Sequence, residues 1–107
     1  MAVLKLIALG SIFAIGINAS ASTYHSYHNC CILQNGNWEY NQSLTYNACL
    51  KFEKDNGAAY DWATQTCEEV KGQPGFSGGD FYQSCKDQAA TLKIDANIVG
   101  AGYSGNC

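Results

Sequence analysis

Histidine and cysteine side chains near the start of the chain are the first candidates for chemistry. His25 and His28 precede the adjacent pair Cys30 and Cys31 in the stretch YHSYHNCC. Imidazoles and thiols can bind zinc or copper, or act as a base and a nucleophile. The chain contains no C-x-x-C pair, and two histidines in a polar N-terminal stretch favour a solvated tail. We therefore expect no metal and no cofactor.

The cysteines are expected to form three disulfide bonds. An even number of cysteines in a short secreted chain is typical of a disulfide framework. Each bridge adds about 2–4 kcal/mol to a domain whose apolar core is small. Bridged sulfur atoms are not nucleophiles, so a thiol enzyme is not expected. The six residues are Cys30, Cys31, Cys49, Cys67, Cys85 and Cys107.

Other catalytic patterns are also missing from the sequence. Glu68 and Glu69 are neighbours on a predicted strand, so their carboxylates point apart and do not form a glycosidase pair. The glycine-rich loop from Lys71 to Gly79 lacks a G-K-[ST] motif and is followed by Asp80, which disfavours a phosphate. We predict that the protein is not an enzyme.

The N-terminal segment predicts export. One lysine, Lys5, precedes an apolar stretch from Leu6 to Ile17, and small residues follow. This stretch is shorter than the about 20 residues of a membrane span, and A-x-A resembles a signal-peptidase site. We predict a signal peptide over 1–21, cleaved after Ala19 or Ala21, a flexible segment over 22–28, and a single disulfide-bonded domain over 29–107. The predicted location is secreted and extracellular.

Charge limits the class of partner. The chain has no arginine, and beyond the predicted leader five lysines face nine acidic residues, a formal net charge near −4. Nucleic acids and anionic membranes both require a basic surface. We therefore expect no nucleic-acid partner and no membrane span. The expected partner is a host or extracellular protein, with a glycan as the alternative, and the chain itself is expected to be a monomer.

Aromatic side chains are the remaining candidates for contact. Trp38 and Tyr40, predicted in a polar loop, could stack on sugars or anchor a protein interface. Trp62 is expected to lie in the core on the same strand face as Tyr60. The sequence N-Q-S at Asn41 is a glycosylation sequon, although Asn41 could instead cap the following helix.

Hydrophobic periodicity and turn signals predict strands and helices in the order β-α-β-β-α-β. This order is typical of a ferredoxin-like α+β fold, in which a four-stranded antiparallel sheet carries two helices on one face. Four cysteines recur every 18 residues, from Cys31 to Cys85, which suggests two strand-and-helix halves. The predicted elements are strand 28–33, helix 43–55, strands 58–62 and 66–70, a helix from its cap at Ser77 to about Ala90, and strand 92–98.

The adjacent cysteines are explained by the alternation of side chains on a strand. Cys30 and Cys31 would face opposite sides of the sheet. A bond between the two is the alternative, but it would strain the peptide. With the second helix over strands one and four, the expected pairs are Cys30–Cys107, Cys31–Cys85 and Cys49–Cys67.

Several of these features together resemble a known group of small secreted fungal proteins. A double cysteine on strand one, a helix carrying ACL, and a second helix reading GGDFYQSCK are similar to the family related in fold to the smut-fungus killer toxin (killer protein six). The resemblance implies a disulfide-bonded, non-enzymatic effector or toxin-like protein that binds an extracellular or host target. A cell-wall glycan module and an antimicrobial killer-like protein are the alternatives. No Lys-Arg or Lys-Lys pair is present, so cutting into two subunits is not expected.

Overall fold

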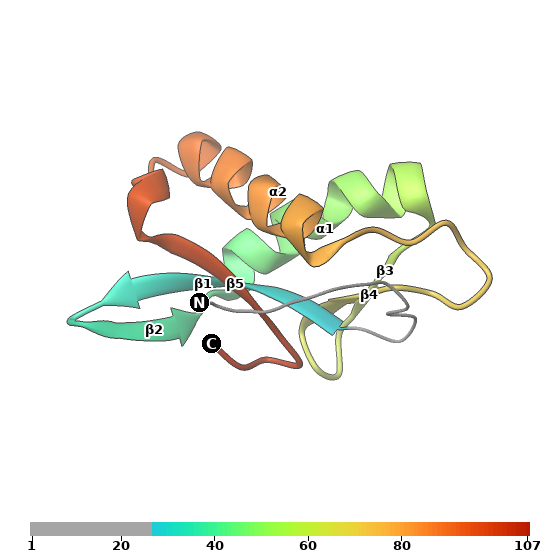
Figure 1. Ribbon diagram of the computed structural model, residues 1–107, viewed down its shortest axis with the longest axis horizontal. Helices are drawn as coiled ribbons and strands as arrows, with labels where there is room; N and C mark the ends of the chain where they lie inside the picture. The colour runs from blue at the N-terminus through green and yellow to red at the C-terminus, as the bar shows by residue number, and fades with distance from the viewer. Residues whose placement is uncertain (1–26) are drawn as a thin grey trace.

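The computed structural model describes residues 27–107 as an α+β domain in which two helices lie on one face of an antiparallel sheet (Figure 1). The predicted signal peptide over 1–21, and His25, lie outside these residues. No helix within 27–107 has the length and apolar character of a membrane span. The elements are β1 (Tyr27–Gln34), β2 (Asn37–Tyr40), α1 (Gln42–Asn56), β3 (Ala59–Asp61), β4 (Thr66–Glu68), α2 (Gly78–Thr91), the 3-10 helix η1 (Ala96–Ile98) and β5 (Val99–Tyr103).

Strand β1 is the centre of a five-stranded sheet. It pairs antiparallel with β5 over residues 28–32, with β4 over 27–28 and with β2 over 31–34. Strand β3 pairs antiparallel with β4. Cys31 has one partner on β2 and another on β5, so these two strands lie on opposite edges of β1. His28 likewise has one partner on β4 and another on β5, so β4 and β5 also lie on opposite edges of β1. Strands β4 and β2 therefore share one edge of β1, and β5 occupies the other.

The predicted count of four strands is wrong because the segment after β1 forms a hairpin. Asn35 and Gly36 both have positive φ, 52° and 80°. A turn with two such residues returns the chain antiparallel to its own strand. Residues 37–40 consequently pair with 31–34 as β2, and Trp38 lies on a strand rather than in the loop that we expected.

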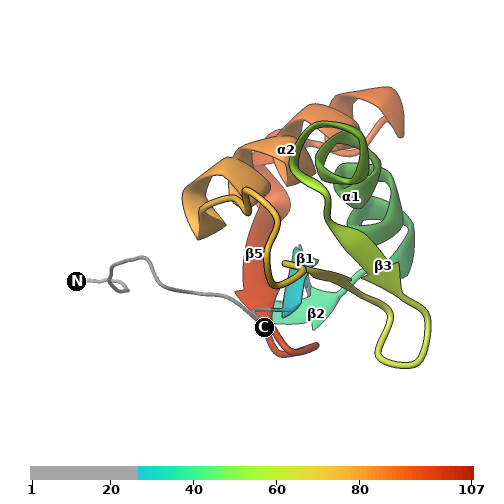
Figure 2. The same cartoon turned by 90° about the vertical axis from the view of Figure 1, so that its right-hand side faces the viewer.

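Helix α2 begins at the predicted cap Ser77, and α1 begins at Asn41, for which capping was the alternative to glycosylation. The Asn41 side chain accepts a hydrogen bond from the Leu44 N–H at 2.9 Å, and the Ser77 hydroxyl accepts one from the Asp80 N–H at 2.9 Å. Helix α1 turns Leu44, Ala48 and Phe52 toward the sheet, as a four-residue spacing requires. Figure 2 shows the two helices side by side above the strands.

The prediction of a last strand over 92–98 is wrong. Lys93 has φ 61°, and the Ile94 N–H bonds to the Ala89 carbonyl, so the chain turns sharply after α2. Asp95 then caps η1 through the Asn97 N–H. The alternation of apolar residues in this segment has another cause: Ile94 and Ile98 pack against the core although they lie in turns and not on a strand. The strand itself is β5, Val99–Tyr103.

Two of the three expected disulfide pairs are wrong. The structure joins Cys30 to Cys85 and Cys31 to Cys107, whereas we expected Cys30–Cys107 and Cys31–Cys85. The two adjacent cysteines do serve opposite faces, but Cys30 faces the helices, together with the core residue Ile32. The apolar run Cys-Cys-Ile-Leu carries no alternation that could have fixed which side is which. Cys49 bonds to Cys67, the third pair that we expected.

Two further expectations about burial are wrong. Tyr27, assigned to a flexible segment, belongs to β1, and His28, where the flexible segment and the predicted strand 28–33 overlap, also lies in β1 and is only 2% exposed. Trp62, expected in the core, is 64% exposed, because β3 ends at Asp61 and Trp62 begins the turn beyond it. Tyr60, two residues earlier, is buried.

Candidate functional site

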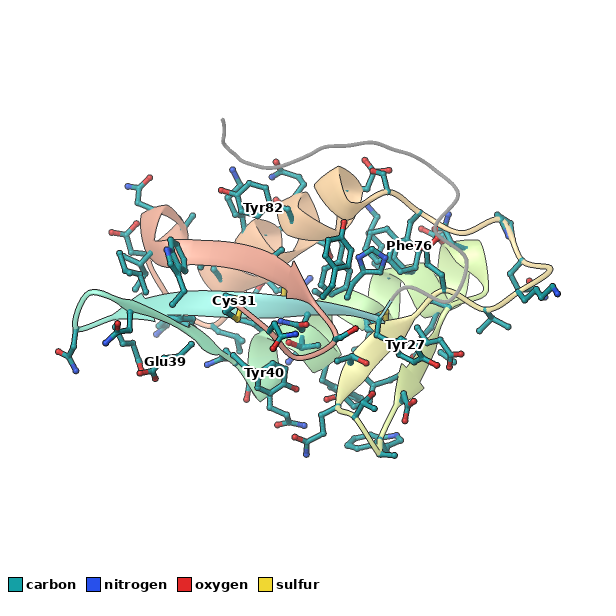
Figure 3. All side chains as sticks on the ribbon, turned by 60° about the horizontal axis from the view of Figure 1, so that its bottom comes forward. Tyr27, Cys31, Glu39, Tyr40, Phe76 and Tyr82 are labelled. Carbon is teal, nitrogen blue, oxygen red and sulfur yellow. A yellow bond between two sulfur atoms is a disulfide. The ribbon has the colours of Figure 1, made fainter. Side chains whose placement is uncertain are left out.

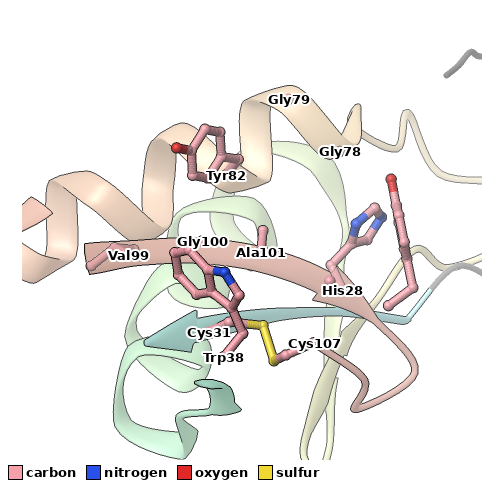
Figure 4. A pocket seen from close by; sticks show the side chains of 12 residues that line it. His28, Cys31, Trp38, Gly78, Gly79, Tyr82, Val99, Gly100, Ala101 and Cys107 are labelled. Carbon is pink, nitrogen blue, oxygen red and sulfur yellow. A yellow bond between two sulfur atoms is a disulfide. The ribbon is translucent and has the colours of Figure 1, made fainter. Parts of the chain in front are cut away.

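A groove runs along β5 between α2 and β2. Its volume is about 560 Å³. Figure 4 shows Tyr82 of α2 above the β5 ribbon and the Trp38 ring across the front of that ribbon beside Gly100. Beside these two aromatics, the lining includes Gly78, Gly79, all five residues of β5 and the Cys31–Cys107 disulfide. The groove thus combines aromatic walls with a glycine-rich strand.

Trp38 forms one wall because β2 and β5 flank the same stretch of β1. Trp38 is 45% exposed, and its ring lies against the backbone of Gly100. A Cβ atom at Gly100 would approach this ring to 3.0 Å, closer than ordinary van der Waals contact. Glycine at position 100 therefore allows the indole to lie directly over β5. Of the predicted contact residues, Trp38 is the one that lines the groove.

The opposite wall is formed by the first turns of α2 and the end of β5. Tyr82 is 40% exposed and Tyr103 50% exposed. The Tyr103 hydroxyl lies so close to Gly78 that a side chain there would collide with it. Partial burial, and then the negative charge of Glu69, raise the pKa of Tyr103 above its ordinary value. The Tyr103 phenol is therefore a neutral hydrogen-bonding and apolar surface at physiological pH.

Behind the groove, His28 and Glu69 form a buried pair. His28 Nε2 lies 2.7 Å from Glu69 Oε2, and the two residues are 2% and 4% exposed. The other Glu69 oxygen accepts a hydrogen bond from the Phe76 N–H at 3.3 Å. The imidazole is packed among the rings of Phe76, Phe81 and Tyr103. This pair is a structural support of the groove, not the solvated tail that we expected for His28.

The glycine-rich loop is also anchored by this cluster. Phe76, within the predicted surface connection 71–79, is 8% exposed and stacks on Phe52 of α1 with ring centroids 4.3 Å apart. A carboxylate oxygen of Glu69 accepts a hydrogen bond from the Phe76 N–H. The loop therefore delivers α2 to the sheet at a fixed position, with Gly78 and Gly79 beside the groove.

Tyr40, the other predicted contact residue, does not line the groove. Figure 3 shows Tyr40 and Tyr82 on opposite sides of β1. The Tyr40 hydroxyl donates a hydrogen bond to the Gln65 carbonyl in the β3–β4 turn. Burial is the main reason that the pKa of Tyr40 lies well above its usual range. Tyr40 therefore braces the sheet beneath α1.

A second exposed aromatic group lies beside this brace. The Trp62 ring packs against Tyr60 and Tyr46, with centroids 4.7 and 5.4 Å apart. The three rings contact one another. Trp62 therefore offers a single exposed ring rather than a lined site.

The remaining candidates have the following positions. Asn41 caps α1 through its Oδ1, and within residues 27–107 its amide nitrogen makes no hydrogen bond, so the sequon stays a predicted glycosylation site. Glu68 contacts the Tyr27 hydroxyl, and Glu69 contacts His28, so these carboxylates point apart. In the part of the chain that is described, no three side chains of His, Cys, Asp and Glu are grouped as for a metal ion.

Sequence reasoning missed Tyr82, Tyr103 and Gly100 as groove residues. Tyr82 occupies the exposed stripe of a helix that we read for its buried stripe, and the β5 sequence VGAGY carries no strand pattern. Only the pairing of β5 with β1 brings these residues near Trp38.

The chain matches no protein-family model, no curated protein and no solved structure.

Proposed function

We propose that the protein is a secreted, non-enzymatic effector-like protein that binds an extracellular or host target in the groove along β5. The observation that carries this proposal is the concentration of exposed aromatic surface at one concave place. Three of the exposed large apolar side chains, Trp38, Tyr82 and Tyr103, line it. Tyrosine and tryptophan dominate the energetics of protein interfaces, because they bury a large area with little loss of conformational freedom.

The surroundings of the groove suit binding better than turnover. Its one imidazole, His28, is buried against Glu69, so it offers no free base to a ligand. The rest of the lining is aromatic, glycine, aliphatic or disulfide. Three disulfides in a small domain are compatible with an extracellular protein.

The proposal includes the finer fold assignment. Strands β5, β1, β4 and β3 follow one another in the sheet as the ferredoxin-like arrangement requires, and β2 is an addition to it. On this assignment the resemblance to the killer-toxin-related effectors supplies the expected class of activity. Antagonism of other microbes, by the same kind of binding, is a variant of this function.

Capture from plant apoplastic fluid tests the proposed function. Wild-type protein is compared with W38A and Y82A, which remove the two walls, and with W62A as a matched control. Trp62 is the more exposed tryptophan but lies outside the groove. We expect a captured protein to be lost with both wall variants and kept with W62A. Equal capture by all four proteins would contradict the groove as the binding site.

A glycan-binding module is the second candidate, and it is favoured by the exposed indole of Trp38. Sugar rings stack on such a surface. Retention on insoluble chitin or glucan that is lost with W38A, but kept with W62A, would support this candidate. Free passage of the wild-type protein through both materials would exclude it.

A further inference from the structure

The outer edge of β5 bears unpaired main-chain groups. Cys30 is the partner of Ala101 in the β1–β5 ladder. The Cys30 N–H, however, donates to the Thr45 hydroxyl at 2.9 Å, and its carbonyl accepts from the Asn41 N–H at 3.0 Å. Both groups of Cys30 thus point away from β5. In an antiparallel ladder this marks a non-hydrogen-bonded pair, so the N–H and C=O of Ala101 point away from β1 as well.

The end of the ladder supports the same register. The Ser104 N–H bonds to the Tyr27 carbonyl at 2.6 Å, so the hydrogen-bonded positions fall at 104, 102 and 100. Val99, Ala101 and Tyr103 therefore turn their main-chain groups to the free edge. The Val99 N–H is used by the Ala96 carbonyl, and the Tyr103 carbonyl by the Asn106 N–H.

Four groups remain in a row along this edge. They are the Val99 carbonyl, both groups of Ala101 and the Tyr103 N–H, and none has a hydrogen-bond partner within residues 27–107. Their order, acceptor, donor, acceptor, donor, is what one further strand requires. Ala101 and Tyr103 are exposed, and all three residues line the groove. Unpaired edges of this kind are templates for another strand.

The groove walls match the side chains that such a strand would carry. Successive side chains of an added strand would point alternately toward α2 and away from it. On the α2 side they meet Tyr82, and Gly78 and Gly79 leave room beside it. On the other side they meet Trp38. Main-chain hydrogen bonds then supply affinity, and the two walls supply selection at alternate positions.

We infer that the groove takes an extended peptide segment of a partner protein, which adds to the free edge of β5 as a further strand. The inference rests on the proposed function and names its ligand. Charge favours a partner over a second copy of the chain, because residues 27–107 of each molecule bear nine acidic residues and five lysines, so two copies would repel one another. We expect the segment to carry apolar or aromatic residues at alternate positions and a basic residue at a flank.

A backbone methylation scan tests the inference directly. Random heptapeptides displayed on phage are selected on the folded, disulfide-bonded protein, and the best peptide is synthesised with one N-methyl group at each position in turn. Methylation removes one N–H without changing a side chain. The free edge offers two acceptors, the Val99 and Ala101 carbonyls, so we expect about tenfold weaker binding at two positions that are two residues apart, the size of one lost hydrogen bond, and little change elsewhere. Equal sensitivity at all positions, or at none, would overturn strand addition.

Protein variants provide the matching test from the other side. A101P removes one edge N–H and should weaken the peptide about tenfold, whereas W62A, an exposed position outside the groove, should bind as the wild type does. Circular dichroism and disulfide mapping check that A101P is folded. The methylation scan decides the question if A101P is not folded.

The alternatives give different results. A peptide that needs Trp38 but shows no methylation pattern would refute strand addition and leave the proposed function standing. Failure to select any peptide, with apoplastic capture still dependent on Trp38, would refute a peptide ligand only. A dimer in sedimentation that A101P dissociates would replace the partner segment by a second copy. Loss of both peptide binding and Trp38-dependent capture would remove the proposed function too.

Discussion

Replacement of His28 by leucine should destabilise the domain strongly, because it leaves Glu69 buried without its partner. The two side chains are 2.7 Å apart, and neither is exposed by more than 5%. Breaking a buried pair by removal of one member costs about 3–5 kcal/mol. Leucine has nearly the volume of histidine, so little of this cost would come from a cavity. We expect H28L to lose about 3 kcal/mol or more of unfolding free energy.

A second substitution should recover part of that loss. In H28L/E69Q the buried group is a neutral amide, whose oxygen can still accept the Phe76 N–H that Glu69 holds at 3.3 Å. Removal of the unpaired charge should return about 1–3 kcal/mol, the desolvation cost of a polar group. The double variant is therefore expected to be more stable than H28L, although it differs from wild type at two sites instead of one.

Urea unfolding at pH 7, with the disulfides intact, measures both values. Single E69Q serves as the control, because its amide oxygen can keep the hydrogen bond to Phe76 while an NH2 group replaces the oxygen that faces His28. A loss below about 1 kcal/mol for H28L would show that the pair contributes as little as a surface ion pair does. A double variant less stable than H28L would contradict the argument from the unpaired charge.

Three further predictions follow from the groove and the tail that borders it. Replacement of Cys31 and Cys107 by serine opens a loop whose ends are 76 residues apart, so the loss of loop-closure entropy should lower the unfolding free energy in urea by about 4.5 kcal/mol. A loss below about 1 kcal/mol would contradict this expectation. G102A should destabilise the tail, because the new Cβ would collide with the Asn106 carbonyl; hydrogen exchange of residues 103–107 should accelerate, and unchanged exchange would refute the clash. The raised pKa of Tyr103 means that the folded state holds the phenol proton more tightly than the unfolded state does. The stability of the wild type should therefore fall as the pH rises above 10, and that of Y103F should fall less. If an absorbance titration shows that Y103F removes a tyrosine that ionises earlier than the others, the assigned direction is refuted.

The parts of the fold that depend on neighbouring residues could be predicted. Asn41 and Ser77 begin their helices because a side-chain oxygen reaches an N–H three residues ahead, which is local geometry. The four-residue spacing of Leu44, Ala48 and Phe52 then fixed which face of α1 is buried. These features require no knowledge of the rest of the chain.

The parts that depend on distant partners could not be predicted. His28 looks like a tail residue until Glu69, 41 residues later, lies next to it. β5 is a strand because β1 offers it an edge, although its glycines weaken any strand signal. Trp62 is large and apolar, but its place just beyond an edge strand leaves it exposed. The groove combines these non-local effects, so of its aromatics only Trp38 could be proposed in advance.

The edge of β5 is held in place from both faces of the sheet, which explains how a glycine-rich strand can serve as a binding surface. On the helix face, the His28 ring packs against Tyr103 with centroids 5.0 Å apart, and Glu69 fixes that ring. On the other face, Asn29 accepts the Gly105 N–H and donates to the Asn106 carbonyl.

The Cys31–Cys107 bond then fastens the tail beneath β5. A strand fixed in this way loses little conformational freedom when a ligand arrives, so more of the contact free energy appears as affinity. The buried pair and the tail disulfide therefore act on binding through stability. Variants that loosen either support should weaken the ligand even though neither His28 nor Cys107 supplies an edge hydrogen bond.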